Sequence, residues 1–189
     1  MQTVKLEEIK NIADYEVERE AWRPQVMALK DRRRVRVGGH LTFLFENRDT
    51  VRYQIQEMVR IERIARTEDI AREVETYNEL IPGPGQLSAS LLIEYATPEE
   101  RDLHLRKLLG IEKHVWLVVG DTAPAPALFD TRQISTDRVS AVQYIKFQLS
   151  PEQVARFPQG AAIRVDHPHY TFERELTAAE LAELAGDLK

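Results

Sequence analysis

The segment from residue 41 to 66, LTFLFENRDTVRYQIQEMVRIERIAR, constrains the fold most, because it has the pattern of a strand, a cap and a long amphipathic helix. Asn47 is a good helix N-cap, and Asp49 suits the positive end of the helix dipole in the first turn. At about 100° per residue, a narrow apolar arc follows the cap. Its members are Val51, Ile55, Met58, Glu62 and Ala65.

Glu62 is the polar member of this arc, so the pattern predicts a carboxylate that faces the core. Burying an unpaired charge is costly, and Glu62 therefore needs a partner. Arg66 is the i+4 residue in the favourable order, and Arg48 lies on the flank of the arc. One interpretation is an ion pair that fixes helix packing. The other is a carboxylate that lines a ligand or metal pocket.

Composition sets the outer limits on function. The chain has 189 residues, 43% of them hydrophobic and 30% charged, which is typical of a globular protein that can bury a sizeable core. The net charge of −5 does not favour general binding to nucleic acid, despite a basic run at residues 30–36. The absence of cysteine excludes disulfides, thiol catalysis and any Cys-ligated metal or cluster.

The N-terminus is too polar for a signal peptide, and no apolar run is long enough to span a bilayer. These features predict a cytoplasmic protein that does not enter the membrane. The arginine-rich face of the long helix could contact a second copy of the chain in a homo-oligomer, or it could be exposed to solvent. The sequence leaves the cofactor, if any, unknown.

The rest of the chain predicts an α+β fold with a mainly antiparallel sheet. Helices are expected over 6–33, broken near Asp14 and kinked or re-capped at Pro24, and over 68–80. A Gly-Gly pair at 38–39 predicts a hairpin between strands 34–37 and 41–45. Further strands are expected at 87–95, 115–119, 139–149, 162–166 and 170–175.

Three capping boxes predict further helices, which begin after Thr97, Ser150 and Thr177. The loop at 120–130 is expected to be exposed. The Pro-Gly run at 82–86 is a candidate sub-boundary, but an isolated hairpin needs more strands for stability, so residues 1–189 are expected to form a single domain.

Motifs for catalysis are missing from the sequence. It has no glycine-rich phosphate loop, no nucleophile elbow and no His-Glu-x-x-His. The pair His167 and His169 could turn both rings to one side of an extended segment and approach one metal ion. The alternative is a His-Pro-His turn with solvated rings. A third ligand would have to come from elsewhere in the chain.

Several pieces of the chain resemble the bacterial family DUF3501, a domain of unknown function. The matching pieces, in order, are FENR at 45–48, YQIQEM at 53–58, RIERI at 60–64, YNELIP at 77–82, GIE at 110–112, VW at 115–116, SAV at 140–142 and DHP at 166–168. The resemblance carries over no catalytic residue. It implies an association with rubrerythrin-like and iron–sulfur oxidoreductase proteins, and hence an accessory role in redox or oxidative-stress metabolism.

Two functions from different classes follow. The first is a non-enzymatic accessory or binding protein that docks on a redox partner. The second is a metal- or small-ligand-binding enzyme with a polar site in the 46–62 segment, near Glu46, Arg48, Gln56, Glu57 and Glu62. The candidate ligand-binding residues are Glu46, Arg48, Glu62 and Arg66, and the candidate metal ligands are His167 and His169.

Overall fold

The computed structural model describes residues 2–130, 132 and 137–189. Eight strands form one antiparallel sheet in the order β1-β2-β3-β6-β5-β4-β7-β8, which curls into a near-barrel and confirms the α+β class. The strands are β1 (Arg34–Val37), β2 (Leu41–Glu46), β3 (Gln86–Ile93), β4 (Val115–Val119), β5 (Ala125–Phe129), β6 (Val142–Gln148), β7 (Ala161–His167) and β8 (Tyr170–Glu175).

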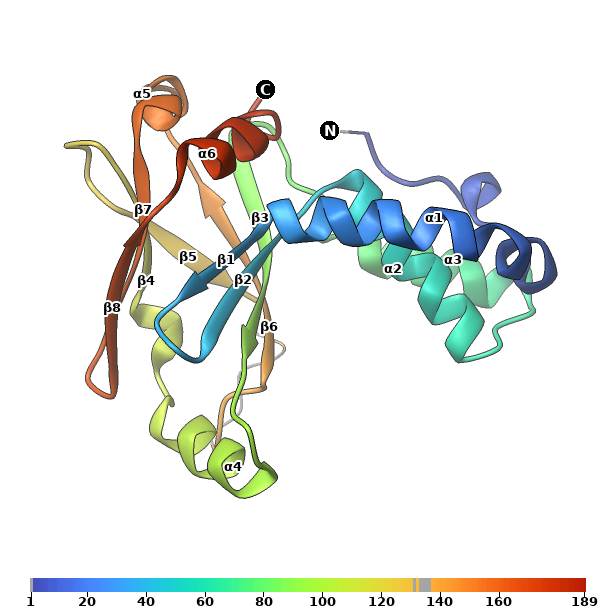
Figure 1. Cartoon of the computed structure of the whole chain (residues 1–189), viewed down its shortest axis with the longest axis horizontal. Helices are drawn as coiled ribbons and strands as arrows, with labels where there is room; N and C mark the ends of the chain where they lie inside the picture. The colour runs from blue at the N-terminus through green and yellow to red at the C-terminus, as the bar shows by residue number, and fades with distance from the viewer. Residues whose placement is uncertain (1, 131, 133–136) are drawn as a thin grey trace.

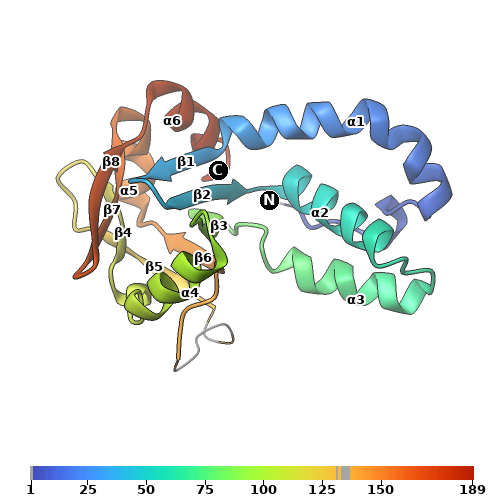
Figure 2. The ribbon, with the colours of Figure 1, turned by 60° about the horizontal axis from the view of Figure 1, so that its bottom comes forward.

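Three helices form an arm that projects from one side of the near-barrel (Figures 1 and 2). They are α1 (Ile12–Arg32), α2 (Arg48–Ile61) and α3 (Thr67–Asn78), and the short 3-10 helix η1 (Leu6–Glu8) precedes them. The remaining helices are α4 (Pro98–Lys107), η2 (Ile111–Lys113), α5 (Pro151–Arg156), η4 (Phe157–Gln159) and α6 (Ala178–Ala185). The capping boxes predicted at Thr97, Ser150 and Thr177 are all present.

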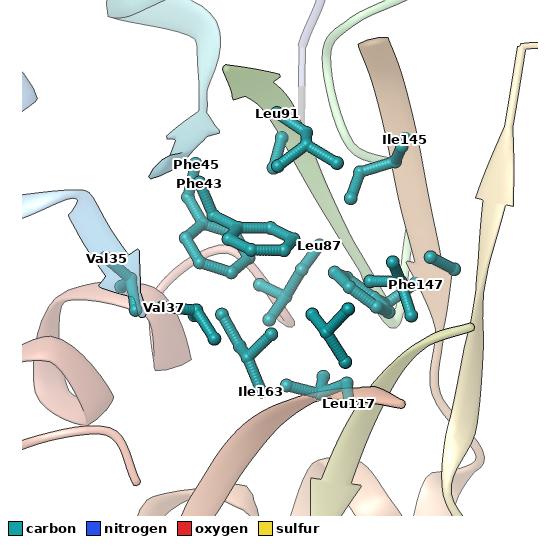
Figure 3. Close-up of a cluster of buried hydrophobic side chains, with 14 of the residues drawn as sticks. Val35, Val37, Phe43, Phe45, Leu87, Leu91, Leu117, Ile145, Phe147 and Ile163 are labelled. Atoms are coloured by element: carbon teal, nitrogen blue, oxygen red, sulfur yellow. The ribbon is translucent and has the colours of Figure 1, made fainter. Parts of the chain in front are cut away.

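The main core fills the near-barrel, and alternate residues of β1, β2, β3, β4, β6 and β7 point into it (Figure 3). Phe43, Leu87, Phe147 and Ile163 are all fully buried there. A second, smaller core joins the helices of the arm and includes Val51, Ile55, Val59 and Val74. The outer face of β2, β3 and β6 carries a group of polar residues close to the base of the arm, where Glu46 contacts Thr50 of α2. Its members are Glu46, Ser88, Ser90, Tyr144 and Lys146. This polar face, between the two cores, is the candidate region for a functional site.

The two edge strands, β1 and β8, come together at the predicted Gly-Gly hairpin. The Tyr170 hydroxyl donates a hydrogen bond of 2.6 Å to the Val37 carbonyl and accepts one of 3.0 Å from the His40 N–H. Gly38 has φ +65°, and a Cβ there would lie 2.4 Å from the Tyr170 hydroxyl oxygen. Only glycine therefore suits both the turn and this close approach.

Three predicted element boundaries are wrong. The break predicted near Asp14 lies instead at residues 9–11, between η1 and α1. Helix α1 is continuous from Ile12 to Arg32, so Pro24 does not re-cap it. Residues 120–130 are not a plain loop, because they contain β5. Pro126 is tolerated there because β5 pairs with β4 only up to that residue and with β6 only after it. The helix predicted to run on to Arg66 ends at Ile61.

No helix in the described part of the chain is both long and apolar enough to cross a membrane.

Candidate functional site

Glu46 ends β2 and is buried on the outer face of the sheet, at 6% exposure. Its carboxylate accepts hydrogen bonds from the Thr50 hydroxyl on α2 and, at 2.6 Å, from the Ser90 hydroxyl on β3. Asn47 forces this proximity, because it caps α2 directly after the strand and turns Thr50 back toward Glu46. Glu46 thus links the sheet to the arm.

Arg48 lies close to Glu46 in sequence but binds a different partner. Its Nη2 donates to both carboxylate oxygens of Glu8, at 2.5 and 2.6 Å. The backbone N–H of Lys5, and then this contact with Arg48, lower the pKa of Glu8. Arg48 therefore anchors the N-terminal segment to α2 through Glu8.

Glu62 is exposed, so the prediction that it faces the core is wrong. The helix ends one residue earlier, and Glu62 occupies the C-cap before Arg63, which has a positive φ of 54°. The helical period predicts a core-facing Glu62 only if the helix continues past this turn, which it does not. Arg66 is also on the surface, where it pairs with Glu68 at 2.8 Å.

The buried carboxylate of α2 is instead Glu57, which faces α1. It accepts hydrogen bonds from the Tyr15 hydroxyl at 2.6 Å and from Arg19 Nε at 2.7 Å, and Arg60 adds a longer contact of 3.3 Å. Burial opposes ionisation of Glu57, but the bonds from Arg19 and Tyr15 outweigh it and lower the pKa to about 2. Glu57 therefore stays charged and holds α1 against α2.

Gln56 lies beside Glu57 but turns to another partner. Its side-chain amide exchanges two hydrogen bonds of 2.9 Å with the backbone of Lys10. Glu46, Gln56, Glu57 and Glu62 therefore have four separate environments and do not share one pocket.

His167 and His169 close the β7–β8 hairpin, with ring centroids 5.8 Å apart. His167 is buried, and its Nδ1 accepts the His169 N–H at 3.2 Å. Its Nε2 lies 3.1 Å from the Leu109 carbonyl, which can only accept, so this nitrogen carries the proton. Both ring nitrogens of His167 are thus engaged. Within residues 2–130, 132 and 137–189, no three His, Asp or Glu side chains are grouped to hold a metal ion.

A cavity opens on the outer face of the sheet, beside Glu46. Strand register places Glu46 opposite Ser88, Ser88 opposite Lys146, and Lys146 opposite Leu128, so one row crosses four strands. The last three of these residues line a cavity of about 260 Å³. The sequence alone could not reveal this row, because it depends on the pairing of strands that are far apart in the chain.

The cavity combines apolar walls with a few polar groups. Leu80, after α3, and Leu128, on β5, are among its apolar members, while Tyr144 and Lys146 of β6 add a phenol and an ammonium group. Burial, and then the charge of Glu46, raise the pKa of Tyr144. Arg132 lies at the rim and pairs with Glu79 at 2.5 Å and Asp130 at 2.8 Å.

Lys146 differs from Arg132 because it forms no ion pair with any described residue. It is only partly exposed, and it projects from the same sheet face as Ser88, which is 2% exposed. A lysine that forms no ion pair with the described residues, next to a hydroxyl and apolar walls, is suited to an anionic group on an otherwise apolar molecule.

The fold and the cavity define an antiparallel near-barrel protein with a three-helix arm, whose cavity lies where the arm meets the outer face of the sheet. The chain belongs to the family described as "Protein of unknown function (DUF3501)", whose model matches residues 3–188. This match confirms the resemblance seen in the sequence.

A solved structure of the same fold comes from Burkholderia pseudomallei K96243, described as a novel protein of unknown function. It is 35% identical to this chain, the alignment covers 100% of both chains, and the TM-score is 0.93. No curated protein matches the chain.

Proposed function

We propose that this protein is a non-enzymatic binding protein that holds a small carboxylate-bearing molecule against the outer face of its sheet. The observation that carries the proposal is Lys146, a cation without an ion-pair partner among the described residues, placed in the wall of a largely apolar cavity. The ligand's carboxylate would pair with Lys146, and its apolar part would lie against Leu80 and Leu128.

The size of the cavity supports a small ligand. At about 260 Å³ it lies just below the range of cavities that hold drug-sized molecules, so a compact aromatic or branched aliphatic acid fits best. We assign binding rather than turnover because the sequence has no nucleophile elbow, no glycine-rich phosphate loop and no His-Glu-x-x-His motif.

The family resemblance supports a proposal for the partner protein. Such proteins tend to be encoded near rubrerythrin-like and iron–sulfur oxidoreductase proteins, so we infer an accessory role beside a redox protein. Affinity capture from the native cell with the full-length protein as bait tests this part. Repeated recovery of one redox protein supports it, and recovery of none under mild cross-linking contradicts it.

A panel of small carboxylates, hydrocinnamate among them, tests the ligand-binding part by thermal unfolding. Ligands that bind the native state raise its melting temperature, and the rise increases with their affinity and concentration. We expect a rise for the wild type, and none for Lys146→Gln. Lys113→Gln removes a lysine outside the cavity and should behave as the wild type. A rise that persists in Lys146→Gln would contradict the proposal.

A further inference from the structure

A groove on the arm has the features of a second, separate binding surface. It runs between α1 and α2, has a volume of about 440 Å³, and lies apart from the carboxylate cavity. One wall is a ridge of α1 made by Val17, Ala21 and Gln25, at helical spacing of four residues. The opposite wall carries Arg52 and Gln56 of α2.

Arg52 is the unusual residue of this groove. It forms no ion pair or hydrogen bond with any described residue, and its Nε is buried without a partner. By contrast, Arg19, Arg48 and Arg60 of the same arm each bind a carboxylate. A buried donor left unpaired is costly, so an occupant that supplies an acceptor would be stabilised here.

The Arg52 guanidinium is also held in place. It lies 5.0 Å from the centroid of the Trp22 ring, in a cation–π contact. Trp22 is itself packed edge-on against Tyr15 and Tyr53, with centroid distances of 6.0 and 5.5 Å. These aromatic contacts restrict the Arg52 side chain. Little conformational entropy is therefore lost when its planar guanidinium group binds a carboxylate.

The walls of the groove indicate what accompanies that carboxylate. Val17 is 82% exposed, although it is a large aliphatic residue, and Ala21 beside it is exposed as well. From residue 17 to 25 the ridge is about 12 Å long, the length of three to four residues of extended chain. Lys10 closes one end and pairs with Glu18, so Arg52 is the cation without an ion pair among the described lining residues.

We propose that this groove binds a short extended segment of a partner protein, in which an acidic residue that pairs with Arg52 is flanked by aliphatic residues that cover Val17 and Ala21. The assignment to a protein rather than a nucleic acid follows from the groove lining, in which Arg52 is the one described cation without an ion pair, and from the net charge of −5. It goes beyond the small-ligand cavity and does not depend on it.

The test uses Trp22 as the reporter. The chain has two tryptophans, so Trp116→Phe isolates the fluorescence of Trp22. The probes are two capped peptides, acetyl-Val-Glu-Leu-amide and its matched control acetyl-Val-Gln-Leu-amide. We expect a saturable change with the Glu peptide and an affinity at least about tenfold lower for the Gln peptide, since the charged hydrogen bond to Arg52 is lost.

Variants in the same background locate the effect. Arg52→Gln should lose the response by about the same factor, while Arg101→Gln, which changes an exposed arginine on α4, should retain it. Circular dichroism establishes that both variants are folded. Equal affinity for the two peptides, or an unchanged response in Arg52→Gln, would overturn the proposal. An Arg52-dependent response to inorganic phosphate that matched the Glu peptide would overturn the assignment to an acidic protein segment.

Discussion

Arg33 and Asp187 are separated by almost the whole chain, yet the Arg33 Nη2 group donates a hydrogen bond to Asp187 Oδ2 in the protein interior. Arg33 is 1% exposed, and its Nε also donates to the Phe45 carbonyl at 2.8 Å. Glu183 of α6 accepts a further bond of 3.1 Å. One side chain thus joins the end of α1, the end of β2 and the C-terminal helix.

Replacing Arg33 by methionine should lower the free energy of unfolding by about 3–5 kcal/mol, because Asp187 would be left buried without its cation. Chemical denaturation measures this loss. Arg32→Met is the matched control, because Arg32 also binds Glu183 but is 58% exposed. It should cost less than about 1 kcal/mol. Equal effects would show that burial of Arg33 does not decide its contribution.

The Glu57 cluster predicts a pH dependence of stability. The pKa of Glu57 is about 2 in the folded protein against an ordinary value of 4.5, so its contribution is fully present above pH 4.5 and is lost as the pH falls toward 2. The shift corresponds to about 3 kcal/mol. Glu57→Gln should therefore be less stable than the wild type near neutral pH, and the difference should shrink on acidification.

The exposed carboxylate Glu68 provides the control for this measurement. Its side chain is 76% exposed, and Glu68→Gln should follow the wild type at every pH. Urea titrations across the acid range compare the three proteins. If the difference in free energy of unfolding between Glu57→Gln and the wild type stays constant down to pH 2, the ionised Glu57 carboxylate does not provide the predicted stabilisation.

Two adjacent glycines should respond very differently to alanine. A Cβ at Gly38 would clash with Tyr170 and Phe172 in a backbone of positive φ, whereas nothing lies within 4 Å of a Cβ at Gly39. Gly38→Ala should lower the free energy of unfolding by about 2 kcal/mol or more, and Gly39→Ala by less than about 1. Thermal unfolding of both variants is sufficient, and similar melting temperatures would argue against the close contact of Tyr170 with the hairpin.

Much of the fold could be predicted from local signals. The Gly-Gly hairpin, the three capping boxes and the strand alternation of 139–149 each depend on residues close in sequence, and the structure confirms them. Glu62 was misplaced because a helical period does not show where a helix ends. Helix α2 ends at the left-handed backbone conformation of Arg63. Arginine rarely adopts this conformation, so the sequence does not predict a turn there.

The candidate site was harder to predict. The position of Glu46 before the cap marks it as a candidate, but its hydrogen bond to Ser90 joins residues that are 44 positions apart in the sequence. The cavity needs Ser88, Leu128 and Lys146 to be neighbours, and only the pairing of β3, β6 and β5 brings them together. Non-local strand register of this kind has no signature in a single sequence.

The most direct test of the central claim is a titration of the ¹⁵N-labelled protein with hydrocinnamate, followed by two-dimensional NMR. Binding in the cavity predicts saturable shifts of the amide signals of Ser88, Leu128 and Lys146, with little change in the signals of α4 and the β7–β8 hairpin. Lys146→Gln should abolish them. The absence of saturable shifts at ligand concentrations on the order of millimolar, or shifts centred elsewhere on the molecule, would contradict the claim.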